Sequence, residues 1–247
     1  MREIVKISSD ATEPDREDVL RMQGIPMDKK PSENTVHLFE KSMELYRTYA
    51  QPMGIVSEIS IPAFEVVYTG EALNEESTPL DEIFRKADNL ALFAVTIGEP
   101  VIEEIDELFK SNEYALGSML DATASAGTEK AADVLEKHFF DFLEKKAETN
   151  SATTILRYSP GYCGWHVSAQ KQLFRYLHPE DIGITLLDSF LMRPLKSISG
   201  VFVAGKREIH VFGDSYPFCR HCETHSCRER IRIIMDKSRP HSRHGGV

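Results

Sequence analysis

The chain has 247 residues, which is room for one large domain or two small ones. Hydrophobic residues make up 41% and charged residues 28%, which excludes a disordered chain, a collagen-like repeat and a disulfide-dense small protein. No stretch approaches the roughly 18–20 apolar residues that cross a bilayer. The N-terminus lacks the apolar region of a secretory signal. We therefore expect a cytoplasmic protein whose four cysteines stay reduced.

The net charge of −10 argues against nucleic-acid binding, and we expect neither a nucleic-acid nor a membrane partner. The charge is unevenly distributed. Residues 1–150 carry 15 basic and 31 acidic groups, whereas residues 151–247 carry 14 and 8. This polarity can steer an anionic ligand or partner toward the basic part. The alternative is an acidic, solvated helical surface that happens to come first.

In the first 88 residues, short strand patterns are mixed with two helical patterns. Gly24 and Pro26 end the first helix, and Ser32 or Asn34 can cap the second, which Pro52 follows. Strands are expected at 4–7, 55–61 and 64–68, and helices at about 15–22 and from the cap to Tyr49. We expect this segment to pack on the remainder of the chain.

Leu90–Ile97 is a continuous apolar run, the pattern of a strand that is covered on both faces. A helix opens at Pro100, and a second helical pattern covers about 113–146. Gly127 within it marks either a break or a close helix contact. The polar residues beside its apolar stripe are expected on the surface: Asp133, Glu136, Lys137, Asp141, Glu144 and Lys145.

After residue 150 the patterns are short. We expect strands at 155–158, 184–187, 196–203 and 208–212, a turn at 204–207 and a helix at 169–177. Strands and helices do not alternate as βαβ units, so the predicted fold class is α+β, with a twisted, mainly antiparallel sheet and long helices. The predicted organisation is an N-terminal segment (1–88), a core (89–213), a cysteine-rich element (214–236) and a flexible tail (237–247).

The segment from Arg157 to Tyr162 places an arginine at the end of a strand, before a Pro-Gly turn and an aromatic residue. Proline fixes φ, and glycine lets a ligand approach the backbone closely. Exposed turn N–H and C=O groups could bind an amino-acid moiety while Arg157 pairs with its carboxylate. The alternative is an ordinary tight turn with a surface arginine.

Arg157-x-x-Pro160-Gly161-Tyr162 resembles the Arg-Pro-x-Pro-Gly-Tyr motif of the activation (reactivation) domain of cobalamin-dependent methionine synthase. The segment 132–144 is similar to the long helix that precedes that turn in the family. Residues 182–189, Pro194 and 197–200 are similar to the family's stretch IG…LTES…P…SVSG. The resemblance covers roughly residues 90–213.

The resemblance implies a domain that binds S-adenosylmethionine in a shallow groove and docks on a corrinoid protein. There, an electron from a flavodoxin-like or ferredoxin-like donor and the methyl group of S-adenosylmethionine restore methylcobalamin from the Co(II) state. By motif position, Arg157 would bind the methionine carboxylate. Ser159 and Gly161 would offer backbone contacts, and the Tyr162 side chain would form one wall of the groove. Asp141 would meet the cation of the ligand, or instead form an ion pair with Lys137 or Lys145.

The Asp-x-His-x-x-Gly pattern of base-off cobalamin modules does not occur in the sequence. There is also no length for a substrate barrel, which needs about 250 residues by itself. The resemblance therefore implies cobalamin bound in trans, on another polypeptide, and a freestanding reactivation partner. Such a protein is a component of a cobalamin-dependent methyltransferase system, and the sequence leaves its own turnover open.

Three cysteines follow one another closely in Cys219-x2-Cys222-x4-Cys227. Close thiolates in a reduced compartment are metal ligands or a redox pair. The fourth ligand would come from Cys163, His166, His221 or His225. Zinc, an iron–sulfur cluster and unligated thiols all fit this spacing. The alternative function is therefore a metal-binding interaction or electron-transfer module that does not bind S-adenosylmethionine.

Trp165 is the single tryptophan, and it either covers a ligand or anchors the core. Lys196, in the sequence Pro-Leu-Lys-Ser, is a further candidate basic residue near the ligand groove that the resemblance implies. The basic residues between 228 and 239 could receive a corrinoid phosphate or an acidic electron donor, or could belong to a solvated helix end.

Overall fold

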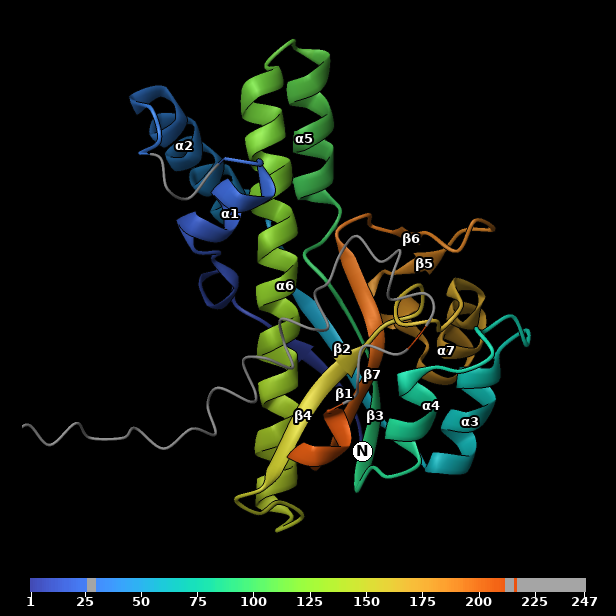
Figure 1. Cartoon of the computed structure of the whole chain (residues 1–247). Helices are drawn as coiled ribbons and strands as arrows, with labels where there is room; N and C mark the ends of the chain where they lie inside the picture. The colour runs from blue at the N-terminus through green and yellow to red at the C-terminus, as the bar shows by residue number, and fades with distance from the viewer. Residues whose placement is uncertain (26–29, 212–215, 217–247) are drawn as a thin grey trace, which may run out of the picture.

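The computed structural model describes residues 1–25, 30–211 and 216. A five-stranded antiparallel sheet, in the order β1-β2-β3-β7-β4, lies at the centre (Figure 1). Its strands are β1 (Arg2–Lys6), β2 (Met53–Glu58), β3 (Asn89–Thr96), β4 (Thr153–Tyr158) and β7 (Ser197–Lys206). A small hairpin pairs β5 (Thr185–Leu186) with β6 (Met192–Arg193). The predicted α+β class is confirmed.

Helices cover both faces of the sheet. They are α1 (Arg16–Met22), α2 (Glu33–Tyr49), α3 (Ile61–Thr69), α4 (Pro79–Phe84), α5 (Pro100–Lys110), α6 (Tyr114–Lys145) and α7 (Gln170–Leu177). Short 3-10 turns are η1 (Asp10–Thr12), η2 (Val167–Ala169), η3 (Pro179–Ile182) and η4 (Arg207–His210). One core lies between the sheet and α5 and α6, and a second lies between the sheet and α3, α4 and α7 (Figure 1). A smaller cluster joins α1 to α6.

The central strand β3 explains why the sheet needs cover on both faces. Its alternate side chains belong to different cores: Phe93 points toward α6, where its ring stacks on Phe202 at 4.1 Å, and Leu92 belongs to the core beneath α3 and α7. The expected strand at Leu90–Ile97 is therefore confirmed. The 1–88 segment contributes β1 and β2 to this same sheet, beside β3.

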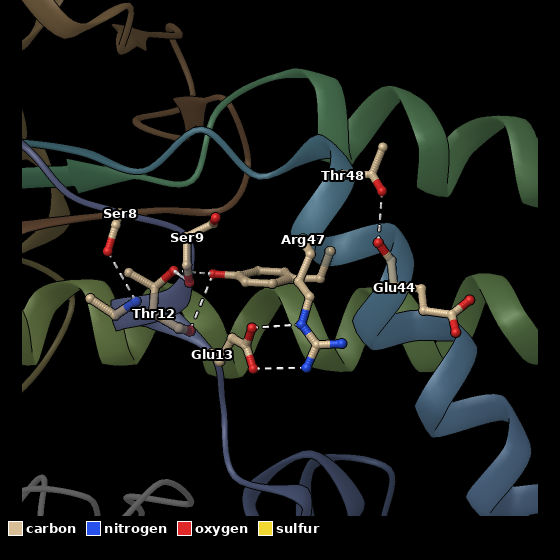
Figure 2. Close-up of polar contacts among 9 residues, drawn as sticks. Ser8, Ser9, Thr12, Glu13, Glu44, Arg47 and Thr48 are labelled. Atoms are coloured by element: carbon tan, nitrogen blue, oxygen red, sulfur yellow. Dashed lines mark hydrogen bonds and ion pairs between the residues drawn. The ribbon is translucent and has the colours of Figure 1, made fainter.

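The long helix α6 organises the N-terminal segment. Gly127 lies directly against Tyr46 of α2, so the glycine marks a close helix contact and not a break. The Tyr46 and Thr12 hydroxyl groups lie 2.7 Å apart, which ties η1 to α2. Figure 2 shows the Glu13 carboxylate facing the Arg47 guanidinium, with N–O distances of 2.6 and 2.9 Å. Residues 8–13 are thereby fastened to the end of α2.

Three local predictions are wrong. Residues 64–68 belong to helix α3, which begins after the N-cap Ser60. The expected turn at 204–207 is the end of strand β7, where Gly205 pairs with Thr154. The expected strand at 208–212 begins as η4. In each case, tertiary contacts or a cap outweigh the β-forming or turn-forming tendency of the side chains.

None of the helices among the described residues combines the length and apolar character that a membrane crossing requires.

Candidate functional site

The turn from Ser159 to Trp165 follows β4 and is closed by its own backbone. Gly161 N donates to Trp165 O at 2.7 Å, and Trp165 N donates to Tyr162 O at 3.0 Å. Gly161, Cys163 and Gly164 all have positive φ, at 92°, 52° and 76°. A left-handed conformation costs a non-glycine residue such as Cys163 about 1–2 kcal/mol, which the surrounding contacts must offset. The turn therefore has a defined, specific shape.

The loop at 70–77, after α3, holds this turn from outside. The Asn74 side-chain oxygen accepts a hydrogen bond from His166 N at 2.9 Å, and its amide nitrogen donates to Tyr68 O at 2.7 Å. Glu75 N donates to Gly164 O at 3.0 Å. One asparagine thus connects the end of α3 to the end of the turn. Nothing in the spacing of the sequence pointed to Asn74.

Arg157, the arginine of β4, is buried beneath α6, with 8% of its surface exposed. Nη1 donates to Asp133 Oδ1 at 2.6 Å, and Nη2 donates to Glu129 Oε2 at 2.7 Å. The Glu136 carboxylate lies 3.6 Å from Nη1. Arg157 is therefore not a loose surface arginine, because three acidic residues of one helix fix its guanidinium.

The charge at this point is negative. Burial by itself lowers the pKa of Arg157, but the carboxylates of Asp133, Glu136 and Glu129 outweigh burial, and the pKa lies above its ordinary value. Three carboxylates against one guanidinium leave a formal charge of about −2 at this edge. The Glu129 and Asp133 side chains are 53% and 58% exposed, so solvent reaches them. The arrangement attracts cationic groups, and an incoming carboxylate needs further positive charge.

The acidic set on α6 was only partly visible in the sequence. Asp133 and Glu136 were expected as surface residues, and their pairing with Arg157 is a tertiary contact that no local pattern encodes. The available signal was the helical spacing of Glu129, Asp133 and Glu136, which places three acids on one side of α6.

The remaining residues of the Arg157 motif line the turn. The Tyr162 side chain is half exposed, at 50%, and Ser159 is partly buried. Gly161 lies at the surface, and a Cβ built on it would come no closer than 4.0 Å to Val167. The turn therefore presents an aromatic ring and accessible backbone directly after the strand that carries Arg157.

Asp141 lies eight residues beyond Asp133, about 12 Å farther along α6. Its carboxylate accepts from Lys137 Nζ at 3.0 and 2.8 Å, the ion pair that the spacing gave as the alternative. The structure does not bring Asp141 to the acids that contact Arg157, which lie nearer the middle of the helix.

Of the four cysteines expected at a metal site, the structure describes Cys163, which is partly buried within the turn. Cys219, Cys222 and Cys227 lie outside the described residues, as do His221 and His225. Within the described part of the chain, no group of three or more His, Cys, Asp or Glu residues could hold a metal ion. His166 instead contacts Ser168 Oγ through Nδ1, at 2.9 Å.

Trp165 ends the turn inside the second core, with 1% of its surface exposed. Its ring packs edge-on against Phe64, at 5.7 Å, and lies 6.1 Å from Tyr68. The core-anchor alternative for Trp165 is therefore confirmed. A buried tryptophan at one end and β4 at the other fix both ends of the turn.

Comparison with known proteins bears on the family and the fold. A family described as "Vitamin B12 dependent methionine synthase, activation domain" matches residues 80–213, just over half of the chain. A crystal structure of the MetH reactivation domain bound to AdoHcy superposes with a TM-score of 0.60 and 17% sequence identity, covering 95% of this chain and 89% of the other. The two share a fold. No curated protein matches the sequence.

Proposed function

The chain belongs to the family of vitamin B12-dependent methionine synthase activation domains, and we propose that it binds S-adenosylmethionine at the 159–165 turn and supports reactivation of a separate corrinoid protein. The observation that carries the proposal is the closed turn that directly follows β4 and its fixed Arg157, inside the family-matched range. The related fold bound to AdoHcy, the demethylated form of this ligand, also supports it.

The charges suit this ligand. S-adenosylmethionine carries a sulfonium, an ammonium and a carboxylate, so its net charge is positive. We propose that its cationic groups lie near Glu129 and Asp133, which are solvent-accessible. Arg157 keeps donors beyond the two bonded to α6, since a guanidinium has five N–H groups. These donors, with the backbone at Ser159 and Gly161, would contact the methionine portion.

Tyr162 would pack on the ligand from the open side of the turn. Asp141 is proposed as a more distant contact, for which it would have to release Lys137. The partner's corrinoid would supply the cobalt centre that accepts the methyl group of S-adenosylmethionine, after one electron from a flavodoxin-like or ferredoxin-like donor has reduced Co(II). The S–CH3 bond breaks with its electron pair left on sulfur, which gives S-adenosylhomocysteine.

Titration calorimetry with S-adenosylmethionine tests ligand binding. Tyr162→Ala removes an exposed ring, so the fold should remain intact, and stacking of a base on an aromatic ring is worth about 1–3 kcal/mol. We therefore expect about tenfold weaker binding. Tyr176→Ala, which removes another exposed tyrosine from α7, is the matched control and should leave the affinity unchanged. Absence of binding by the wild-type protein would refute the proposal.

Arg157→Ala should abolish detectable binding, because truncation of a buried, charge-assisted contact costs about 2–5 kcal/mol. Circular dichroism and thermal unfolding of this variant show whether it still folds. Co-purification with a corrinoid protein, followed by a cobalamin-reactivation assay, tests the partnership separately. A chain that binds S-adenosylmethionine but never restores methylcobalamin would contradict the reactivation part of the proposal.

We also propose a test for the cysteine set, whose three C-terminal members lie outside the described residues. Metal analysis and a visible spectrum of anaerobically purified protein distinguish zinc, an iron–sulfur cluster and free thiols. Colourless protein with one zinc would make the cysteines structural. Iron with broad visible absorbance would favour the electron-transfer alternative.

A further inference from the structure

Lys196 approaches α6 from the start of β7. Its Nζ lies 2.7 Å from Asp121 Oδ1 and donates to Ser125 Oγ at 2.8 Å, while 17% of its side chain stays exposed. Its carbonyl oxygen accepts from Ile97 N and from the Thr96 hydroxyl, both at 3.3 Å. The backbone at Lys196 is therefore fixed, and its ammonium group sits at the boundary between helix and solvent.

Lys196 and Arg157 reach α6 from neighbouring strands. Arg157 pairs with Phe202 of β7, whose ring packs in the core beneath α6. Side chains along a strand alternate between faces, so positions 196, 198 and 200 of the β7 segment face the same way as Phe202. Gly200, between the two cations, carries no side chain. The two cations thus lie on one face of the sheet edge.

On α6, the contacts of both cations form one stripe. Asp121, Ser125, Glu129 and Asp133 recur every fourth residue, so they lie on one side of the helix. Lys196 contacts the first two and Arg157 the last two. Ser125 and Glu129 are one turn apart, about 6 Å along the helix.

The two cations differ in how much negative charge surrounds them. Arg157 faces three carboxylates, whereas Lys196 faces Asp121 and a neutral hydroxyl. An ammonium group has three N–H donors, and contacts with the described residues account for two of those of Lys196. The local charge at Lys196 is therefore close to zero, and one donor is available to an anionic group.

We propose that Lys196 is a ligand-binding residue that supplies the second positive charge for the carboxylate of the bound methyl donor. Three acids oppose the approach of a carboxylate to Arg157, whereas Lys196 faces one acid that its own charge balances, so a carboxylate meets less repulsion at Lys196. The sulfonium and ammonium groups then face Glu129 and Asp133. This inference rests on the proposed function, because it concerns the same ligand at the same sheet edge.

The test compares two ligands that differ in one group: S-adenosylmethionine and its decarboxylated form, which keeps the sulfonium but lacks the carboxylate. Lys196→Met keeps the length of the stem and removes the charge. We expect Lys196→Met to bind S-adenosylmethionine at least about tenfold more weakly and to bind the decarboxylated form within about twofold of wild type. Lys171→Met, at an exposed lysine of α7 that pairs with Glu71, is the matched control.

A purely structural tether between β7 and α6 would behave differently. Lys196→Met would then weaken both ligands equally or neither, and either result overturns the inference. Asp121→Asn adds a second measurement, since it releases Lys196 from its ion pair. Unchanged or tighter binding of S-adenosylmethionine supports a ligand-binding lysine, whereas the same loss as in Lys196→Met indicates a tether. Wild-type protein that binds neither ligand refutes the proposed function itself, and the inference with it.

Discussion

The hydroxyl group of Tyr46 occupies the space that a side chain on Gly127 would need: a Cβ built on Gly127 would lie 2.3 Å from that oxygen. Tyr46 is fully buried, and its hydroxyl is bound to Thr12, so the ring cannot move aside without breaking that contact. Burial raises the pKa of Tyr46 to about 12, which keeps the phenol neutral. The α2–α6 contact therefore depends on a glycine.

We expect Gly127→Ala to lower the free energy of unfolding by about 1–3 kcal/mol, the usual cost of overpacking. Without this steric conflict, alanine would stabilise the helix by about 1 kcal/mol relative to glycine. A destabilised Gly127→Ala variant would therefore point to the contact with Tyr46. Gly117→Ala in the same helix is the control, because its Cβ would meet Leu108 at an ordinary 3.4 Å. Urea unfolding of both variants checks this, and equal stability of Gly127→Ala and wild type would contradict it.

A second prediction concerns His210, which is fully buried in η4. Its Nδ1 lies 3.2 Å from the Tyr158 hydroxyl, and burial lowers its pKa from 6.5 to about 4. The unfolded chain therefore takes up a proton as the pH falls through 6.5, whereas the folded protein does not until about pH 4. The contribution of His210 to the free energy of unfolding is therefore complete above pH 6.5 and is lost as the pH falls from 6.5 to 4. The shift corresponds to about 3 kcal/mol.

The measurement for His210 is the free energy of unfolding at several pH values between 7 and 4, for wild type and His210→Gln. Acidic groups with lowered pKa values, such as Glu13 and Glu58, also reduce stability in acid, but they are common to both proteins. The difference between the two curves isolates the histidine. A difference that does not change with pH would show that His210 titrates normally.

The third prediction concerns Asn74, which joins α3 to the 159–165 turn through two hydrogen bonds. Asn74→Ala leaves His166 N without its acceptor, so we expect a loss of about 1–3 kcal/mol in stability. Under the proposed function, it also weakens S-adenosylmethionine binding. Asn74→Asp keeps an acceptor for His166 N and loses only the donor to Tyr68 O, so its effect should be smaller. Calorimetry and thermal unfolding measure both, and equal losses in the two variants would contradict the assigned roles.

The regular elements could be predicted because their signals are local. The apolar run at Leu90–Ile97 gave β3, and the apolar stripe of residues 131–142 gave most of α6. Helix α3 was missed because its aromatic and β-branched residues favour a strand, although Ser60 and Pro62 carried the helix-start signal. Each wrong prediction concerned a segment whose side chains are compatible both with the predicted type of secondary structure and with the observed one.

The candidate site could be predicted only in part, for a different physical reason. The turn after β4 follows from Pro160 and Gly161, whose conformational preferences are local. The acids around Arg157 come from a helix that lies about 20 to 30 residues earlier in the chain, and their contact with it depends on how α6 crosses the sheet. The contact of Lys196 with Asp121 spans even more sequence. Charge partners at such separations are a property of the tertiary fold.

The last prediction follows from the position of Gly200, where β4 leaves the sheet. A Cβ built on Gly200 would lie 2.1 Å from the Tyr158 carbonyl oxygen, which is backbone and cannot rotate away. Gly200→Ala must therefore displace the end of β4 and the adjoining Ser159, at a cost of at least about 2 kcal/mol. Because Arg157 precedes Tyr158, the displacement also strains its contacts with α6.

Gly205→Ala in the same strand is the matched control. A Cβ on Gly205 would meet the flexible end of the Ile209 side chain, at 2.6 Å, and that side chain can shift. We expect Gly205→Ala to cost less in urea unfolding and to leave ligand affinity unchanged. Gly200→Ala should lower both stability and affinity for S-adenosylmethionine, because it acts on the strand end that carries Arg157. Wild-type affinity in a folded Gly200→Ala variant would mean that ligand binding does not depend on the end of β4, which would contradict the placement of the site.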